Sequence, residues 1–184
     1  PLRLRRVVPD LNLKIDDDDF TLFGLPRRYA LDPAALDAHW RMLQAQVHPD
    51  RHASGGVAAQ RVAMQWAVRV NEAYRRLKDP LRRGAYLGEL GGAPIDAHSN
   101  TAMPKALLHQ QMEWREALED ARGVADVEQL DEQVARHQAE QLGLLADLID
   151  RDADLPAAAA QVRALMFLAR LRDDIHHRLE ALDA

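Results

Sequence analysis

The tripeptide His48-Pro49-Asp50 has the clearest capacity for chemistry in this sequence. The Asp50 carboxylate can pair with both nitrogens of an arginine guanidinium on a partner protein. The His48 imidazole can hydrogen-bond within its own turn or to the same partner. Pro49 restricts the backbone between the two side chains, which reduces the entropy lost when a partner binds them. These residue types predict a recognition element, although an ordinary turn with polar residues at a helix end has the same composition.

Several catalytic and metal-binding chemistries are disfavoured. His48 and His52 have the four-residue spacing of zinc ligands on a helix, but Pro49 interrupts a helix between them. The sequence has no cysteine, which excludes disulfides and thiolate-held metal or iron–sulfur sites. It has neither a glycine-rich phosphate loop nor a serine or cysteine nucleophile motif. We expect a protein that is not an enzyme and holds no metal or cofactor. A metal-dependent hydrolase built on His48, Asp50 and His52 stays open as an alternative.

Two amphipathic helices are predicted on either side of the tripeptide. Asp32 and Pro33 suit the cap and the first position of a helix, and Pro49 ends that helix because it pushes the residue before it out of the helical region. The apolar positions of this helix recur at intervals of 4, 3 and 4 residues, at Leu36, Trp40, Leu43 and Val47. After a loop over residues 50–56, a second apolar stripe comprises Ala63, Trp66, Ala67, Val70, Ala73, Tyr74 and Leu77. The two stripes predict an antiparallel hairpin with the tripeptide at its tip.

The whole chain is predicted to be all-α. Of its 184 residues, 47% are hydrophobic and only 5% aromatic, and good helix formers are frequent. We expect a flexible leader over residues 1–19, a helical unit over 20–92, a linker over 93–104 and a three-helix bundle over 105–184. Four consecutive aspartates, Asp16 to Asp19, end the leader and lack the spaced ligands and the glycine of a calcium loop.

The two halves of the chain carry opposite net charge. Residues 20–92 contain 11 Lys/Arg and 6 Asp/Glu, a net charge of +5, whereas residues 100–184 contain 9 and 17, a net charge of −8. This distribution favours an acidic partner for the first half and a basic partner for the second. The overall charge of −5 and the lack of a basic stripe argue against nucleic acid. No apolar run approaches the roughly 20 residues that span a bilayer, and no signal-peptide core is present, so we expect a cytoplasmic protein.

Two further motifs accompany the tripeptide in the order that is typical of J-domains. They are the run Val-Asn-Glu-Ala-Tyr over residues 70–74 and the run Leu-Lys-Asp-Pro-Leu-Arg-Arg-Gly-Ala-Tyr over residues 77–86. Together with His48-Pro49-Asp50, they resemble a J-domain. The resemblance extends further, because the runs over residues 20–26 and 49–55 and the helical C-terminal part are similar to the HscB family of J-proteins. This similarity covers the chain from about residue 19 to its end.

Similarity to the HscB family implies a co-chaperone with two partners. One is the DnaK-type chaperone HscA, whose ATPase it would stimulate, and the other is the iron–sulfur scaffold IscU. The resemblance implies that the chaperone is engaged by the tripeptide, together with Arg51 and Arg41; J-domains usually carry several basic residues where this chain has only Arg41. The scaffold would bind a patch on the first and third bundle helices. The positions that match this patch are Leu108, Met112, Glu113, Glu116, Asp120 and Phe167.

The spacing of the patch residues supports this assignment independently. Four of them follow i, i+4 spacing and therefore share one face of a helix, namely Leu108, Met112, Glu116 and Asp120. Apolar residues flanked by acids suit a basic, partly apolar partner. The alternative is that Leu108 and Met112 only widen the core face of their helix, whose predicted stripe is Leu107, Trp114 and Leu118.

Two other functions remain open at this stage. The chain could be a J-protein for a different client and chaperone, or a helical interaction protein with no chaperone role. Because mitochondrial relatives often carry an N-terminal cysteine-pair metal site, the lack of cysteine indicates a bacterial protein. We expect a monomer or weak dimer that binds neither nucleic acid nor a membrane.

Overall fold

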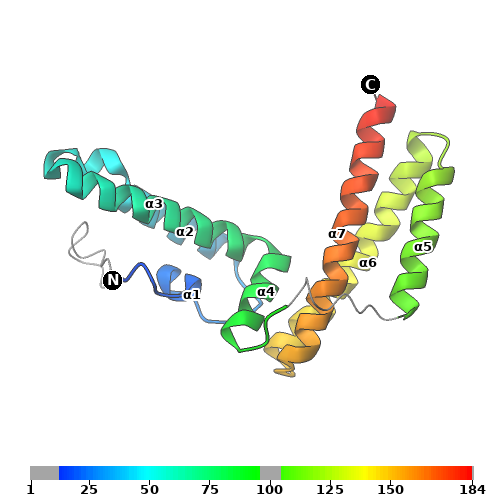
Figure 1. Ribbon diagram of the computed structural model, residues 1–184, viewed down its shortest axis with the longest axis horizontal. Helices are drawn as coiled ribbons and strands as arrows, with labels where there is room; N and C mark the ends of the chain where they lie inside the picture. The colour runs from blue at the N-terminus through cyan, green and yellow to red at the C-terminus, as the bar shows by residue number, and fades with distance from the viewer. Residues whose placement is uncertain (1–12, 96–104, 184) are drawn as a thin grey trace. The chain divides into compact units, whose positions relative to one another are not determined.

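The computed structural model describes residues 13–95 and 105–183 (Figure 1). Its elements are α1 (Asp19–Phe23), α2 (Pro33–Val47), the 3₁₀ helix η2 (Pro49–Gly55), α3 (Gly56–Lys78), α4 (Pro80–Leu90), α5 (Lys105–Asp120), α6 (Val124–Asp150) and α7 (Leu155–Asp183). The predicted all-α fold is confirmed. The chain forms two compact units that divide between Arg83 and Gly84, and we call them the N-terminal and C-terminal units.

The N-terminal unit is built around an antiparallel pair of helices, α2 and α3, which η2 joins at one end (Figure 1). The predicted start of α2 is confirmed, because the Asp32 side chain accepts a hydrogen bond from the Ala34 N–H and Pro33 is the first helical residue. The apolar stripes of α2 and α3 meet α1 in one core. Its large, fully buried side chains are Phe20, Leu36, Leu43, Val47, Trp66 and Leu77. Burial of each such side chain contributes about 1.5–3 kcal/mol, so this core holds the hairpin rigid.

Asn71 links α3 to α2 beside that core. Its side-chain oxygen accepts hydrogen bonds from Trp40 Nε1 and from Gln44 Nε2, each over 3.0 Å. The amide oxygen has two lone pairs, so both donors are satisfied by one acceptor. Because Trp40 and Gln44 lie one turn apart on α2, these bonds fix how far α2 can slide along α3.

A second set of contacts continues this link along the same two helices. The Tyr74 hydroxyl donates to Asp37 Oδ1 over 2.9 Å, and the Tyr74 ring stacks on the Trp40 ring with centroids 4.6 Å apart. Lys78 Nζ donates to the same Asp37 oxygen over 2.6 Å. The hydrogen bonds from Lys78 and from Tyr74 together lower the pKa of the Asp37 carboxyl below its usual value. Asp37 is therefore a carboxylate that both helices share.

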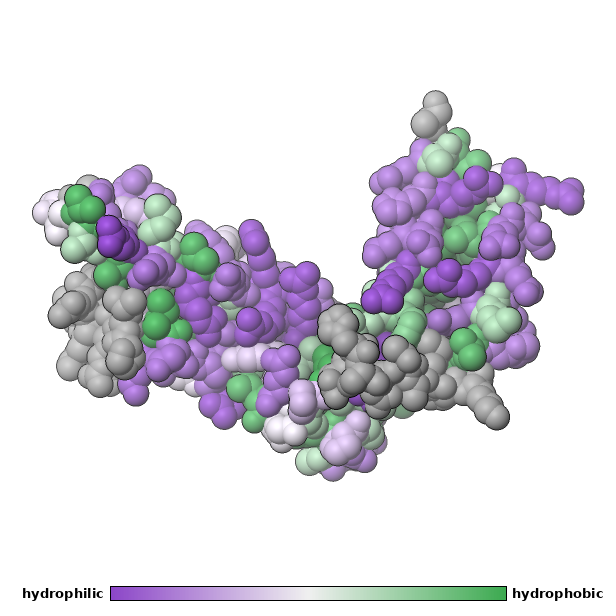
Figure 2. Space-filling view, viewed as in Figure 1, coloured by the Kyte–Doolittle hydropathy of each residue, from purple (hydrophilic) through white to green (hydrophobic). Residues whose placement is uncertain are grey.

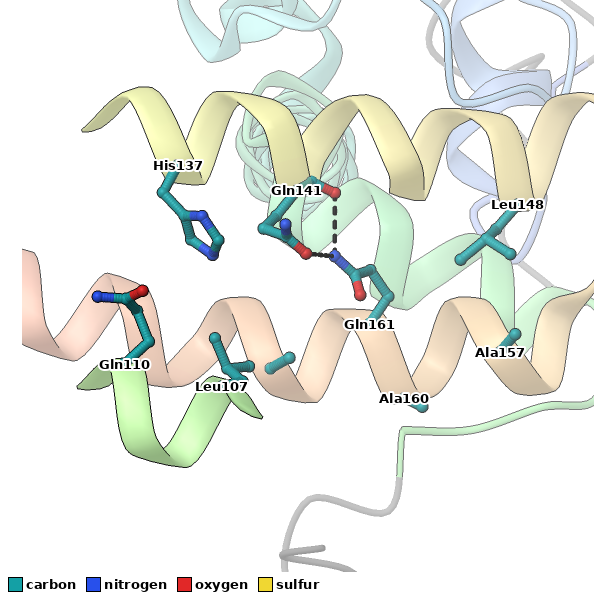
Figure 3. A pocket seen from close by; sticks show the side chains of 9 residues that line it. Leu107, Gln110, His137, Gln141, Leu148, Ala157, Ala160 and Gln161 are labelled. Atoms are coloured by element: carbon teal, nitrogen blue, oxygen red, sulfur yellow. Dashed lines mark hydrogen bonds between the residues drawn. The ribbon is translucent and has the colours of Figure 1, made fainter. Parts of the chain in front are cut away.

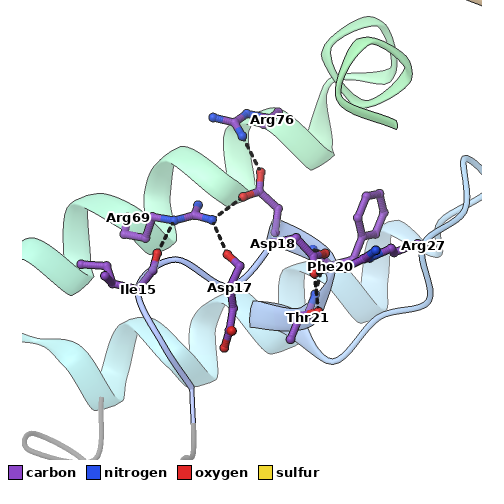
Figure 4. Close-up of polar contacts among 9 residues, drawn as sticks. Ile15, Asp17, Asp18, Phe20, Thr21, Arg27, Arg69 and Arg76 are labelled. Carbon is purple, nitrogen blue, oxygen red and sulfur yellow. Dashed lines mark hydrogen bonds and ion pairs between the residues drawn. The ribbon is translucent and has the colours of Figure 1, made fainter. Parts of the chain in front are cut away.

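The last residues of the predicted leader pack against α3 (Figure 4). The Arg69 guanidinium donates to the backbone oxygens of Ile15 and Asp17 over 3.1 and 2.9 Å. It also pairs with Asp19, whose carboxylate is fully buried and lies 2.7 Å from Arg69 and 3.3 Å from Arg76. A buried carboxylate requires such partners, because desolvating an unpaired charge is costly. Residues 13–19 are thus part of the folded unit, so the flexible leader predicted over residues 1–19 is too long by these residues. Residues 1–12 lie outside the described residues.

The C-terminal unit contains the predicted three-helix bundle. Helix α6 runs antiparallel to α5 and α7, so α5 and α7 run in the same direction (Figure 1). The fully buried side chains of α6 and α7 include Val127, Val134, Leu145, Leu165, Leu168, Leu171 and Ile175. Arg172 of α7 makes a two-pronged ion pair with Asp131 of α6, with N–O distances of 3.1 and 3.2 Å, and donates to Gln138. Because a two-pronged pair requires one relative orientation of its partners, it helps to fix how α6 and α7 pack along their apolar interface.

The second half of α4 belongs to the C-terminal unit. A Cβ atom at Gly91 would meet the end of the Leu155 side chain, so α4 and α7 are in close contact there. The Arg163 guanidinium donates to the Ile95 carbonyl over 2.7 Å. The contact division at Arg83 therefore precedes the predicted limit at residue 92. The limits 20–92 and 93–104 stay predictions for the functional domain and its linker, of which residues 96–104 lie outside the described part.

Candidate functional site

The tip of the α2–α3 hairpin is a 3₁₀ helix and not the loop predicted over residues 50–56. Pro49 suits its first position, because its φ angle is fixed and no N–H is needed there. His48 lies between α2 and η2 in an extended conformation, with φ −61° and ψ 127°, as is usual before proline. The Arg51 N–H donates to the His48 carbonyl over 3.1 Å. The tripeptide is thus held in one backbone conformation.

His48 and Asp50 project from this tip into solvent. The His48 side chain is 56% exposed and the Asp50 side chain 90%. The Asp50 backbone N–H donates to His48 Nδ1 over 3.3 Å, which orients the imidazole over its own turn. Asp50 Oδ2 lies 3.7 Å from the same Nδ1 atom. Both carboxylate oxygens of Asp50 therefore stay accessible to a partner cation.

Arg51 and His52 turn back from the tip and close the end of α2. Arg51 donates to the Ala45 carbonyl over 3.0 Å, and His52 Nε2 lies 2.9 Å from the Gln46 carbonyl, to which it donates. Carbonyls in the last turn of a helix have no partner within the helix, and Pro49 has no N–H to offer them. The two side chains satisfy these carbonyls and so stiffen the turn that carries the tripeptide.

A metal-dependent hydrolase at this tip would need His48, Asp50 and His52 to converge on one ion. His52 Nε2 is engaged by a backbone carbonyl and does not join His48 and Asp50. Among the residues that the structure describes, no group of three or more His, Cys, Asp or Glu side chains is placed to hold a metal ion. The same part of the chain contains no helix with the length and apolar character needed to cross a bilayer.

The outer face of α2 adds one cation to the surface near the tip. Arg41 is exposed, and so are Met42, which is 49% exposed, and Ala45. Arg51 is exposed as well, although its guanidinium contacts Ala45. The predicted chaperone-binding residues His48, Pro49, Asp50 and Arg51 are therefore gathered at the tip, with Arg41 about two helical turns before His48 on the flanking helix.

The α5 helix carries five of the six predicted scaffold-binding residues. Leu108 and Met112 are 49% and 53% exposed, whereas Trp114 is buried in the bundle. Glu116 and Asp120 continue the exposed line at i, i+4 spacing. Hydrophobic residues interrupt the polar surface of the bundle in the space-filling view (Figure 2). The exposure of Leu108 and Met112 argues against the alternative that they only widen the core face.

The remaining two patch residues have local partners. Glu113 accepts a hydrogen bond from Gln110 over 3.0 Å and lies 3.4 Å from His109 Nε2. Phe167 is half-buried on α7, and the Arg170 guanidinium lies over its ring, 5.7 Å from the centroid. The patch therefore combines an apolar part from two helices with an acidic edge on α5.

Comparison with known proteins decides the family. The chain is 49% identical over 174 residues to a protein named co-chaperone protein HscB homolog from Burkholderia multivorans, covering 93% of this chain and 99% of the relative. This chain belongs to the HscB co-chaperone family. Residues 103–176 match the family model described as the HSCB C-terminal oligomerisation domain. The resemblance on which the sequence interpretation relied is thereby confirmed.

Solved structures of the HscB family share the fold. Chaperone HscB from Vibrio cholerae is 34% identical, with a TM-score of 0.78, over 90% of this chain and 99% of that one. Human co-chaperone protein HscB is 25% identical, with a TM-score of 0.87, over 100% of this chain and 94% of that one. The order of helices that presents the tripeptide and the α5–α7 patch is thus an HscB architecture.

A cavity in the bundle of this HscB-family chain was not predicted from its sequence (Figure 3). It has a volume of about 530 Å³ and lies among α5, α6 and α7, with Leu107 and His137 in its lining. Gln161 crosses one wall and donates to the side-chain and backbone oxygens of Gln141 over 2.7 and 3.1 Å. Leu107 belongs to the inner side of α5, so the cavity and the Leu108–Met112 surface use different faces of that helix. Three alanines of α7 line the cavity, and small apolar side chains of this kind do not mark a binding site in a sequence.

Proposed function

We propose that this chain is the co-chaperone that delivers an iron–sulfur scaffold of the IscU type to a DnaK-type chaperone of the HscA type. In this proposal the bundle binds the scaffold, and the tripeptide stimulates the chaperone's ATPase, which promotes cluster transfer to iron–sulfur proteins. Hydrolysis occurs in the chaperone, so this chain acts by binding alone and is not an enzyme. The names of its relatives, which are HscB co-chaperones, support the role. We place it in the bacterial cytoplasm, where the chaperone finds ATP.

The observation that carries the proposal is the accessible Asp50 carboxylate on a stiff turn. Asp50 is 90% exposed, while Arg51 and His52 hold the turn from behind. A pair between this carboxylate and a chaperone arginine is charge-assisted and contributes about 1.5–3 kcal/mol. A ligand shifts an equilibrium only by its differential affinity for two states. We infer that Asp50 binds the ATP-bound chaperone in the conformation that leads to hydrolysis.

The scaffold side of the proposal rests on the surface of α5 and α7. Leu108 and Met112 offer exposed apolar area, and Glu116 and Asp120 lie beside them. The net charge of −8 over residues 100–184 favours a basic partner at this end of the chain. A central apolar contact with a charged rim is the usual anatomy of a specific protein interface.

An ATPase assay with the chaperone, the scaffold and this protein, singly and together, tests the proposal. We expect this protein to stimulate the chaperone alone, and the scaffold to raise the rate further only when this protein is intact. Replacing Met112 and Phe167 together by alanine should abolish the additional effect of the scaffold and leave direct stimulation unchanged. Stimulation without any scaffold binding would instead favour a J-protein for another client, and absence of stimulation would favour a helical interaction protein.

A further inference from the structure

The ion pair between Arg115 of α5 and Asp174 of α7 shows which residues of the two helices lie at the same height in the bundle. Their side chains lie 3.7 Å apart, one on each helix. Because α5 and α7 run in the same direction, residues an equal number of positions before this pair lie at similar heights in the bundle (Figure 1). Leu108 and Phe167 are each seven residues, or about two helical turns, before Arg115 and Asp174. Two turns also return a residue to nearly the same face, so Leu108 and Phe167 lie on the same side of the α5–α7 pair as Arg115 and Asp174.

Charges of opposite sign flank this apolar pair. On α5 two exposed acids, Glu116 and Asp120, continue the line of Leu108 and Met112. On α7 the exposed residue one turn after Phe167 is Arg170, whose guanidinium covers the Phe167 ring. The exposed acids Asp173 and Asp174 follow it one turn later, and Asp174 pairs with Arg115. The surface therefore has two acids on α5, an apolar centre, and one cation, Arg170, directly against that centre on α7.

Within the described residues the Arg170 cation has no carboxylate partner, unlike Arg115, Arg136, Arg151 and Arg172 of the same unit. Arg122, Arg163 and Arg178 also lack one there, but Arg170 differs from them in lying over the aromatic ring of Phe167. The Phe167 ring holds the guanidinium in place through its negative face, which restricts the side chain before a partner arrives. An ordered, unpaired guanidinium at the rim of an apolar centre is suited to a bidentate pair with a carboxylate.

We propose that Arg170 binds a carboxylate of the scaffold and so fixes the orientation in which the scaffold lies across α5 and α7. The inference rests on the proposed function, since it concerns the same surface. It requires a scaffold face on which an apolar contact is flanked by a cation, toward Glu116 and Asp120, and by an acid, toward Arg170. Docking the scaffold the other way round would bring its cation to Arg170 and its acid to Glu116 and Asp120, which is unfavourable.

Binding of the full chain to purified IscU, measured by calorimetry, tests the role of Arg170. Arg170→Glu should weaken binding at least tenfold at low salt, and the loss should shrink as salt is raised. Arg136→Glu is the matched control, because Arg136 is an exposed arginine of the same bundle on α6, and it should bind within about twofold of the unchanged protein. Equal effects of the two substitutions would overturn the proposal.

Carbodiimide crosslinking tests the predicted pair directly. The chain has only three lysines, Lys14, Lys78 and Lys105, so Arg170→Lys introduces a distinctive amine beside Phe167. This variant should crosslink to an aspartate or glutamate of the scaffold, and Arg136→Lys should not. Absence of that crosslink, or a crosslink of residue 170 to a second copy of this chain, would overturn the proposal. If unaltered protein does not bind the scaffold at all, the proposed function itself fails; if it binds and only the Arg170 variants behave normally, this inference alone fails.

Discussion

Asn71 and Trp40 are joined by a hydrogen bond of 3.0 Å from the indole Nε1 to the amide oxygen. The asparagine belongs to the sequence motif that suggested a J-domain, and its position explains why that residue type is used. A side-chain acceptor at this height of α3 serves the partly buried Trp40 indole and the Gln44 amide together. The contact acts at a distance from the tripeptide, because it sets the register of α2, whose last residue, Val47, precedes His48.

Replacing Asn71 by alanine should destabilise the N-terminal unit by roughly 1–3 kcal/mol, since two partly buried donors lose their acceptor. Hydrogen exchange of the α2 and α3 amides measures this without a contribution from the bundle. Gln65→Ala, at an exposed position of the same helix, should leave exchange nearly unchanged. Similar protection in both variants would show that Asn71 does not hold the hairpin.

Asp19→Ala should cost about 3–5 kcal/mol, because it leaves Arg69 and Arg76 facing a site from which their carboxylate has been removed. Thermal unfolding of the full chain in a Trp114→Phe background, followed by the fluorescence of Trp40 and Trp66 in the same unit, reports the change. Asp16→Ala alters an exposed neighbour in the same run and should stay within about 0.5 kcal/mol of the unchanged protein. A small effect at both positions would contradict the assignment of Asp19 to the folded unit.

The cap of α1 should make the N-terminal unit resistant to moderate acid. Burial raises the pKa of the Asp18 carboxyl, but hydrogen bonds from Arg27 and Thr21 outweigh burial and lower that pKa to about 2. A carboxyl with a depressed pKa contributes stability that is complete above its unfolded value, 3.8, and is lost as the pH falls through about 2.

Arg27→Gln should therefore raise the pKa of the Asp18 carboxyl toward 3.8 and move the acid loss of stability to higher pH. Carboxyl-carbon NMR titration of Asp18 measures the pKa directly, and unfolding between pH 2 and pH 5 measures the consequence. An unchanged Asp18 titration in the variant would contradict the proposed role of Arg27.

The helix that leads to the tripeptide could be predicted because its signals are local. Asp32 and Pro33 start α2, and Pro49 ends it, as the structure confirms. The 3₁₀ form of the tip could not be predicted, because it depends on Arg51 and His52 reaching carbonyls six residues earlier in the chain. A loop and a short 3₁₀ helix have the same polar composition until such contacts are known.

The aspartate run shows a different limit. Four adjacent acids are usually a solvated segment, and nothing in their spacing distinguishes Asp18, which caps α1, from Asp19, which is fully buried. The partners that separate them, Arg69 and Arg76, lie about fifty residues further along the chain. Patterns within one element cannot reveal a buried ion pair of that sequence separation.

The exposure of the α5 surface could be predicted from residue spacing, but the height of Phe167 relative to Leu108 in the bundle could not. The i, i+4 line from Leu108 follows from helix geometry alone. Matching Phe167 to Leu108 requires knowing that α5 and α7 run in the same direction and that Arg115 meets Asp174.

Stimulation of the HscA-type ATPase by Asp50→Asn tests the central claim most directly. The substitution keeps the size of the side chain and removes its charge at a position that is 90% exposed, so the fold should be unaffected, as circular dichroism can verify. Glu72→Gln makes the same charge change at an exposed position of α3 and serves as the control. We predict that Asp50→Asn abolishes stimulation of single-turnover ATP hydrolysis while Glu72→Gln retains it. Normal stimulation by folded Asp50→Asn would contradict the account.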